Sequence, residues 1–319
     1  MIVVGGEALV DLVPSAATTP GELGPLLPRP GGGPFNTAVA LGRLGADVSF
    51  LSRLSTDGFG DALLDRLHAA GVRTDLVTRG PEPTTLAVVT LAGDGGARYA
   101  FHVLGTADRL VTDPGPLPDE VTAVSLGTLS LVLEPGATAY ETVLRREAAR
   151  GRLTVLDPNI RAGLVDDPAA YRARFLSWLP DIGVLKVSED DARWLGGTDD
   201  VQRLVRDWLA AGVTAVVLTR GAGGISVRTA GPRVAVPSAP AAVVDTIGAG
   251  DTVHAALLAW LDRHDAASPD GVAALDESGW TDALGFAARA AALTVGRVGA
   301  QPPYAAEIIS PENPTGRPG

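Results

Sequence analysis

The segment from Asp245 to Asp251 combines glycines and carboxylates in a pattern that suits phosphoryl chemistry. Its sequence is Asp-Thr-Ile-Gly-Ala-Gly-Asp, and apolar residues at helical spacing follow from Val253 to Leu261. Two glycines so close together predict a turn at the N-terminus of that helix, where unpaired N–H groups and the helix dipole attract an anion such as phosphate. Asp251 then has two compatible interpretations. It is a helix N-cap, or it is a base that takes a proton from an alcohol attacking phosphorus.

A second group of polar residues lies near the N-terminus. Asp11 is a carboxylate in an apolar stretch. It either caps a turn before Pro14 or accepts hydrogen bonds from two neighbouring hydroxyls of a sugar. The glycine run 31–33 precedes a helical pattern that begins at Asn36. Such glycines either form a flexible linker or let the backbone approach a ligand closely, and the apolar helix directly after them favours the second interpretation.

Three predicted strands farther along the chain lead to polar residues. The first leads to Asp157 and Arg161, and this arginine pairs either with Asp157 or with an anionic substrate. The second carries Lys186 and leads to Glu189, which by itself is a favourable acid in the first turn of a helix. The third leads to the glycine-rich segment 219–224, which taken alone is typical of a hairpin turn.

Strands and helices alternate after residue 120, which predicts an α/β fold with a mainly parallel sheet covered on both faces. Ligands of such folds bind at the carboxyl ends of the strands, where the polar residues of the last three segments are placed. Two alternating runs joined by a turn at 93–96 predict a hairpin that adds to a small separate sheet. The predicted strands of the main sheet are 2–4, 47–54, 121–127, 153–156, 184–187 and 215–218, followed by a hairpin over 223–236. The strands of the small hairpin are 84–91 and 97–103, and the helices are 61–69, 137–150, 168–178, 189–195 and 199–211. We expect one domain over 1–310, with a β-sheet lid formed by about 12–32 and 84–108, and a loose tail over 311–319.

The composition excludes several classes of function. The net charge of −11 argues against nucleic acid or an anionic membrane as a partner. The absence of cysteine excludes disulfides and Cys-based metal sites. Lys186 is the only lysine and lies outside any glycine-rich loop, so an ATP site here is not a P-loop. No apolar run approaches the ~20 residues of a membrane span, and the N-terminus lacks the basic start of a signal peptide, so we expect a cytoplasmic protein.

Segment 245–251 resembles the C-terminal signature Asp-Thr-x-Gly-Ala-Gly-Asp of the ribokinase-like (PfkB) sugar kinases. In that family the last Asp is the catalytic base and the Gly-Ala-Gly amides form an anion hole. The resemblance therefore assigns the base to Asp251 and the anion hole to Gly248, Ala249 and Gly250.

The glycine run and Asn36 are similar to the family's N-terminal Gly-Gly-x-x-x-Asn-x-Ala motif, and the resemblance covers nearly the whole chain in the correct order. It implies a ribokinase-like fold, in which the lid covers the sugar and often pairs with another subunit's lid to form a homodimer. The residues that would hold the sugar are Asp11, Gly32, Gly33, Asn36 and Arg161.

The resemblance also implies ATP and Mg²⁺, and in some members K⁺. Glu189 would organise the hydrated Mg²⁺, and Lys186 would lie near the ATP phosphates. The remaining nucleotide contacts would be Thr219, Gly221, Gly224 and Gly250. Ala288 stands where ribokinases carry an asparagine beside adenine. A monovalent cation would be held by the carbonyls of Asp245 and Ile247, with residues near Thr294 and Gly299.

The acceptor is expected to be fructose, phosphorylated at O6. The segments 6–11 and 101–108 resemble those of fructokinases, whereas the Asp-Pro-Asn-x-Arg form of 157–161 is shared with 2-keto-3-deoxygluconate kinases. Alternatives are a 2-keto-3-deoxygluconate kinase, a ribokinase or a nucleoside kinase. A different class is a sugar- or nucleotide-binding regulator on a kinase fold, against which the intact Asp251 argues.

Overall fold

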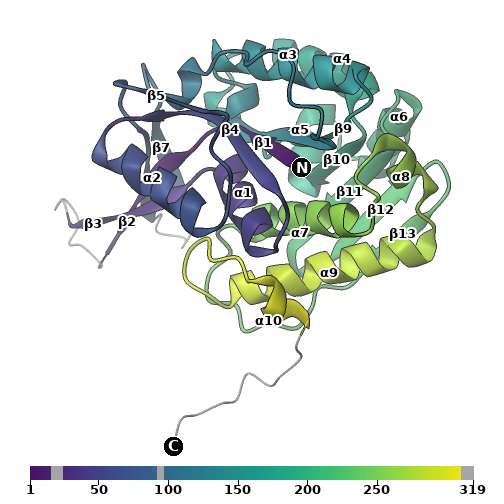
Figure 1. Cartoon of the computed structure of the whole chain (residues 1–319). Helices are drawn as coiled ribbons and strands as arrows, with labels where there is room; N and C mark the ends of the chain where they lie inside the picture. The colour runs from purple at the N-terminus through teal and green to yellow at the C-terminus, as the bar shows by residue number, and fades with distance from the viewer. Residues whose placement is uncertain (16–23, 92–96, 310–319) are drawn as a thin grey trace, which may run out of the picture.

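The computed structural model describes residues 1–15, 24–91 and 97–309. These residues form a large nine-stranded sheet between two layers of helices, and a smaller four-stranded sheet beside it (Figure 1). In the described part of the chain, no helix is long and apolar enough to cross a membrane.

The large sheet is parallel except at one edge. Its order is β13-β12-β11-β10-β9-β8-β1-β4-β5, and only β12 and β13 run antiparallel to their neighbours. The central strands are apolar along most of their length because helices cover both of their faces. The strands are β1 (Ile2–Gly5), β4 (Val48–Ser55), β5 (Val77–Gly80), β8 (Ala123–Gly127), β9 (Leu153–Asp157), β10 (Val184–Ser188), β11 (Ala215–Thr219), β12 (Ile225–Thr229) and β13 (Arg233–Val236).

The two helical layers build separate hydrophobic cores on the two faces of this sheet. One core is centred on the contact between α7 and α9, and the other is filled by tryptophans such as Trp178 and Trp208. The first layer holds α1 (Gly33–Arg43), α2 (Gly58–Ala69), α7 (Ala249–Arg263), α8 (Pro269–Ala274), α9 (Glu277–Val295) and α10 (Ala305–Ile309). The second holds α3 (Gly136–Ala149), α4 (Pro168–Trp178), α5 (Glu189–Gly196) and α6 (Val201–Ala210).

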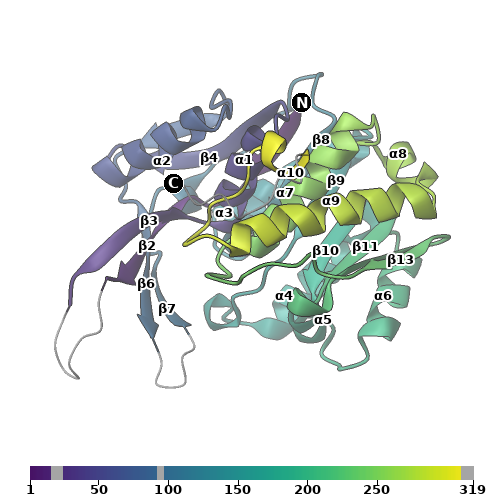
Figure 2. The same ribbon diagram turned by 90° about the horizontal axis from the view of Figure 1, so that it is seen from below.

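The small sheet projects from the body of the molecule (Figure 2). Its strands are β2 (Leu9–Pro14), β3 (Leu26–Gly31), β6 (Thr85–Leu91) and β7 (Ala97–His102), in the order β3-β2-β6-β7. The predicted α/β class, with a mainly parallel sheet and a separate β-lid, is therefore confirmed. The turn predicted at 93–96, part of the segment 12–32 and the tail 311–319 lie outside the described residues.

Three helices begin several residues earlier than the sequence patterns indicate, and one of them, α2, begins at Gly58 rather than Asp61. Helix α7 begins at Ala249, and its N-cap is Gly248 in the left-handed conformation with φ 77°. Asp251 thus lies inside the first turn, and the interpretation of Asp251 as the N-cap is wrong. Helix α1 begins at Gly33 rather than Asn36, with a proline in its first turn, so the last glycine of the run is part of the helix. Elements β5, α8, α9 and α10 were not predicted.

Candidate active site

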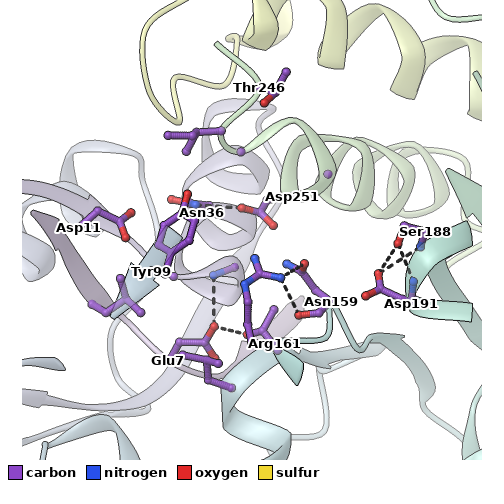
Figure 3. A pocket seen from close by; sticks show the side chains of 18 of the residues that line it. Glu7, Asp11, Asn36, Tyr99, Asn159, Arg161, Ser188, Asp191, Thr246 and Asp251 are labelled. Carbon is purple, nitrogen blue, oxygen red and sulfur yellow. Dashed lines mark hydrogen bonds between the residues drawn. The ribbon is translucent and has the colours of Figure 1, made fainter. Parts of the chain in front are cut away.

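A cavity of about 420 Å³ lies where the lid meets the carboxyl ends of the parallel strands. Its lining comes from the lid, from α1 and α7, and from the segments that follow β1, β8, β9, β10 and β11 (Figure 3). The predicted sugar-side residues Asp11, Gly32, Gly33, Asn36 and Arg161 all line it, as do Gly248, Gly250, Asp251, Lys186, Thr219 and Ile247. Parallel strands end at one edge of their sheet, so these distant segments meet there.

Asp251 lies at the base of the cavity in the first turn of α7. Its side chain is 8% exposed, and one carboxylate oxygen accepts a hydrogen bond of 2.9 Å from the Asn36 side-chain amide (Figure 3). Burial raises the pKa of Asp251 to about 6, while Asn36 and the Lys186 ammonium lower it. A carboxylate with this pKa is ionised at neutral pH and is still a better proton acceptor than an ordinary aspartate.

The lid and the glycine run form the opposite wall. Asp11 lies on β2 with its carboxyl group toward the cavity (Figure 3), and burial raises its pKa to about 6. Its place inside a strand excludes the interpretation as a turn cap. Gly32 has φ 105°, and a Cβ at that position would lie 2.7 Å from the Glu7 carbonyl oxygen. Tyr99 and Phe101 stack with ring centroids 5.9 Å apart and line the same wall.

Glu7 is a cavity residue to which no role was assigned. It is 3% exposed and accepts hydrogen bonds from the Gly33 and Ser130 amides, at 3.3 and 3.1 Å, and from the Thr128 hydroxyl. Burial raises the pKa of Glu7 to about 7. The sequence signals for this residue are an acid shortly after the first buried strand and its place in segment 6–11, which resembles that of fructokinases. Glu7 joins the start of α1 to the segment after β8, which fixes the glycine run against the sheet.

Arg161 does not pair with Asp157, so the structural alternative considered for this arginine is wrong. The arginine is exposed and donates to the Asn159 side-chain oxygen at 2.7 Å (Figure 3). Asp157 instead forms a buried ion pair with Lys186, with 2.6 Å between Nζ and Oδ2. Burial by itself would lower the pKa of Lys186, but Asp157 raises it above the usual lysine value, so the ammonium stays charged beside Asp251.

The structure places Glu189 outside the residues that line the cavity. One of its carboxylate oxygens accepts from Arg220 Nε at 2.6 Å and the other from Arg193 at 3.0 Å. Asp191 lines the cavity instead, and it forms a capping box with Ser188 at the start of α5 (Figure 3). The spacing in the sequence favoured Glu189, the first acid after β10. The capping box at the start of α5 instead places Asp191, the third acid, in the lining of the cavity.

A second, largely apolar cavity of about 580 Å³ adjoins the first. The two cavities share Thr219, Thr246 and Gly250 in their linings. Of the predicted nucleotide contacts, Thr219, Gly221, Gly224 and Gly250 line the second cavity, together with Ala288. The resulting arrangement is a polar chamber and an apolar chamber that meet at the N-terminus of α7, where an anion is favoured.

The residues expected around a monovalent cation are only partly together. The Asp245 carboxylate accepts from the Ile247 and Gly299 amides, at 3.0 and 2.8 Å, and so joins two segments far apart in sequence. Thr294 is buried on α9, and its hydroxyl lies 3.0 Å from the Thr252 hydroxyl of α7. The structure thus places Asp245, Ile247 and Gly299 together, and directs the Thr294 side chain toward α7.

Comparison with known proteins gives a consistent result. Residues 1–307 match the pfkB family carbohydrate kinase profile. A fructokinase of Rhizobium leguminosarum bv. trifolii is 42% identical over 279 residues, which are 87% of this chain and 84% of that protein.

Two solved structures are also similar. The fructokinase of Xylella fastidiosa with bound ATP has a TM-score of 0.86 at 28% identity and covers 96% of both chains. The fructokinase of Vibrio cholerae O395 with fructose, ADP and calcium has a TM-score of 0.78 at 25% identity and covers 94% of both chains. Because the family profile and the relatives cover nearly all of this chain, it belongs to the pfkB family of carbohydrate kinases.

Proposed function

We propose that this carbohydrate kinase transfers the γ-phosphoryl group of ATP to O6 of fructose. The observation that carries the proposal is the position of Asp251, in the lining of the polar cavity beside Gly250, which the polar and apolar cavities share. A sugar fits the polar chamber and adenosine fits the apolar one, with the transferred phosphoryl group between them. Relatives that are named fructokinases, at 30–42% identity over most of the chain, support fructose as the acceptor.

In this mechanism Asp251 accepts the proton of the sugar hydroxyl as that oxygen attacks phosphorus. Asn36 holds the carboxylate in position, and Asp11 accepts hydrogen bonds from other hydroxyls of the sugar. Gly248, Ala249 and Gly250 form the N-terminus of α7, and the amides of Gly248 and Gly250, which line the polar cavity, would stabilise the developing negative charge. The Ala249 amide donates to the Thr246 carbonyl at 3.2 Å.

The donor set also fits the ions that the family implies. No group of three or more acidic or histidine side chains able to hold a metal occurs among the described residues, which suits a Mg²⁺ bound mainly by phosphates and water. Asp191, rather than Glu189, is the α5 acid that would contact its water shell. When bound, Mg²⁺ neutralises charge on the phosphates. The segments joined by Asp245 would offer backbone carbonyls to K⁺.

The proposal is tested by turnover on a panel of sugars with ATP and Mg²⁺, together with Asp251→Asn. We expect wild type to use fructose better than ribose, a nucleoside or 2-keto-3-deoxygluconate. We expect Asp251→Asn to lower kcat by roughly 10²–10⁴ while ATP and fructose still bind, because only the proton acceptor is lost. Near-normal kcat in this variant would contradict the assignment of the base, and turnover on none of the sugars would favour a binding protein.

A further inference from the structure

A small cavity adjoins Asp251 and is lined by residues of α1 and α7 and of the carboxyl ends of β8 and β9. Its volume is about 10 Å³, and its lining includes Asp157, Asp251 and His254. A space of this size holds one water molecule, provided that polar groups bind it. The three side chains are 6%, 8% and 2% exposed, so bulk solvent does not satisfy them.

Two polar atoms of these side chains have no hydrogen-bond partner among the described residues. They are Asp157 Oδ1 and His254 Nδ1. The opposite atom of each side chain is occupied, since Asp157 Oδ2 binds Lys186 at 2.6 Å and His254 Nε2 lies 2.7 Å from the Ser125 hydroxyl. A buried carboxylate oxygen and a buried ring nitrogen without partners are costly, and both belong to residues that line the same cavity.

We propose that one structural water molecule occupies this cavity and positions the catalytic carboxylate. Its oxygen accepts from His254 Nδ1–H, and its two hydrogens are donated to Asp157 Oδ1 and to the Asp251 carboxylate. This assignment leaves His254 Nε2 as the acceptor of the Ser125 hydroxyl, so every donor and acceptor of the imidazole is used. It requires a neutral His254, and burial followed by the Lys186 charge lowers the pKa of this histidine to about 3.

The water would favour the ionised form of Asp251, because it donates a hydrogen bond to the carboxylate. The charged or titratable groups around Asp251 are Lys186, Asp157, Arg161, His254 and, across the polar cavity, Asp11. Lys186 and Arg161 already lower the pKa of Asp251 and Asp157 raises it. His254 acts on Asp251 only through the water and is therefore a positioning residue. This inference rests on the proposed role of Asp251 as the base.

Two variants of His254 separate the two sides of the imidazole. His254→Asn places an amide at the same number of bonds from Cβ as Nδ1, so it keeps the group that faces the water and loses the partner of Ser125. His254→Gln places its amide at the position of Nε2, so it keeps the partner of Ser125 and loses the group that binds the water. Thermal unfolding and ATP affinity serve as controls for folding.

We expect kcat/KM of the Asn variant to follow the wild-type pH profile. We expect the acid limb of the Gln variant to move up by about one pH unit, because Asp251 loses a donor to its charged form. The proposal would be overturned if the acid limb of the His254→Gln variant did not shift, or if the acid limbs of the Asn and Gln variants shifted equally.

Crystallography of the wild-type enzyme at a resolution that shows ordered water gives a second measurement. We expect density between Asp157 Oδ1 and His254 Nδ1, and an empty cavity would overturn the proposal whatever the kinetics. If Asp251 were not the base, neither His254 variant would shift the acid limb of the kcat/KM profile, and Asp251→Asn would keep its activity. The water would still be present in the crystal. The two failures are therefore distinguishable.

Discussion

At the scale of single residues, burial sets the chemistry of the site. Asp11 and Asp251 are carboxyl groups whose pKa burial raises to about 6. The Asp251 charge raises the pKa of Asp11 further, and Arg161 lowers the pKa of both groups. The two carboxylates on facing walls of the cavity therefore have pKa values only slightly below neutral pH. Asp251 is for this reason a stronger base than an ordinary aspartate, and the ionisation of Asp11 changes with pH in the same range.

This arrangement predicts the pH dependence of kcat/KM, which reports the free enzyme. Both carboxylates act in their ionised form, and both become protonated as the pH falls through about 6, so activity is lost there. We expect the logarithm of kcat/KM to fall on the acid side with a slope approaching two protons. Asp11→Asn should reduce this slope to one proton at a raised KM for the sugar, and an unchanged slope of two would mean that another group titrates.

Arg161 provides a second residue-scale prediction, because it separates two acceptors. Fructose is neutral, so Arg161→Gln should act chiefly on kcat by removing a charge near the moving phosphoryl group. We expect a loss of roughly tenfold to hundredfold, less than for a fully buried donor because this guanidinium is exposed to solvent. If wild type instead preferred 2-keto-3-deoxygluconate, and the variant raised KM for that acid, Arg161 would be its carboxylate partner.

At the scale of elements, the backbone at the strand ends is strained where it meets the cavity. Thr128 and Asn159, which follow β8 and β9 by one and two residues, have positive φ values of 57° and 38° and line the cavity. Such conformations are uncommon for residues other than glycine and are retained where the surrounding structure holds them. At Thr128 that support includes the hydrogen bond to Glu7, and at Asn159 it includes the contact with Arg161.

The start of α7 gives a prediction at this scale. Gly248 has φ 77°, and a Cβ there would lie 2.7 Å from the Ala300 Cβ. Gly248→Ala should therefore cost about 1 kcal/mol of folding stability through the backbone alone and also move the anion hole away from the segment at Ala300. We expect kcat to fall while the fold is retained.

Gly71→Ala is the matched control for this variant. Gly71 has nearly the same φ, 79°, with no atom within 4 Å of an added Cβ, and it follows α2 outside the cavity lining. It should lose similar stability in thermal unfolding and keep its kcat. Equal activities of the two variants would mean that the position of the α7 N-terminus does not limit catalysis.

At the scale of the whole molecule, the lid is a separate four-stranded sheet beside the main body. Its edge strand β3 exposes Leu26 and Leu27, at 41% and 45% exposure. An edge strand with exposed apolar side chains is open to pairing with another chain. These features favour the pairing of the lid with the lid of a second copy of the chain, which the resemblance led us to expect.

Leu27→Lys should weaken that dimer, because a charge would be buried in the interface. We expect sedimentation to show a dimer for wild type and a shift toward monomer for the variant, together with a higher KM for the sugar. Leu176→Lys, on α4 and 53% exposed, is the control and should leave the assembly unchanged. A monomeric wild type at all concentrations would contradict the proposed assembly.

The sequence by itself determined the fold class, the family and most of the residues around the polar cavity. These inferences depend on short-range patterns, such as glycines before an apolar helix or a carboxylate directly after a buried strand. The resemblance of three separate segments to the motifs of one family then places Asp11, Asn36 and Asp251 in a single site.

Tertiary structure alone decided which charged groups pair. Asn36 and Asp251 are 215 positions apart, and Glu7 and Thr128 are 121 positions apart, so no local pattern encodes their hydrogen bonds. Lys186 lies beside Asp157 because β9 and β10 are neighbours in the sheet, and Glu189 turns toward arginines because Ser188 and Asp191 cap α5. Strand order and helix rotation result from packing of the entire core, and they determine which of several nearby polar side chains reaches the cavity.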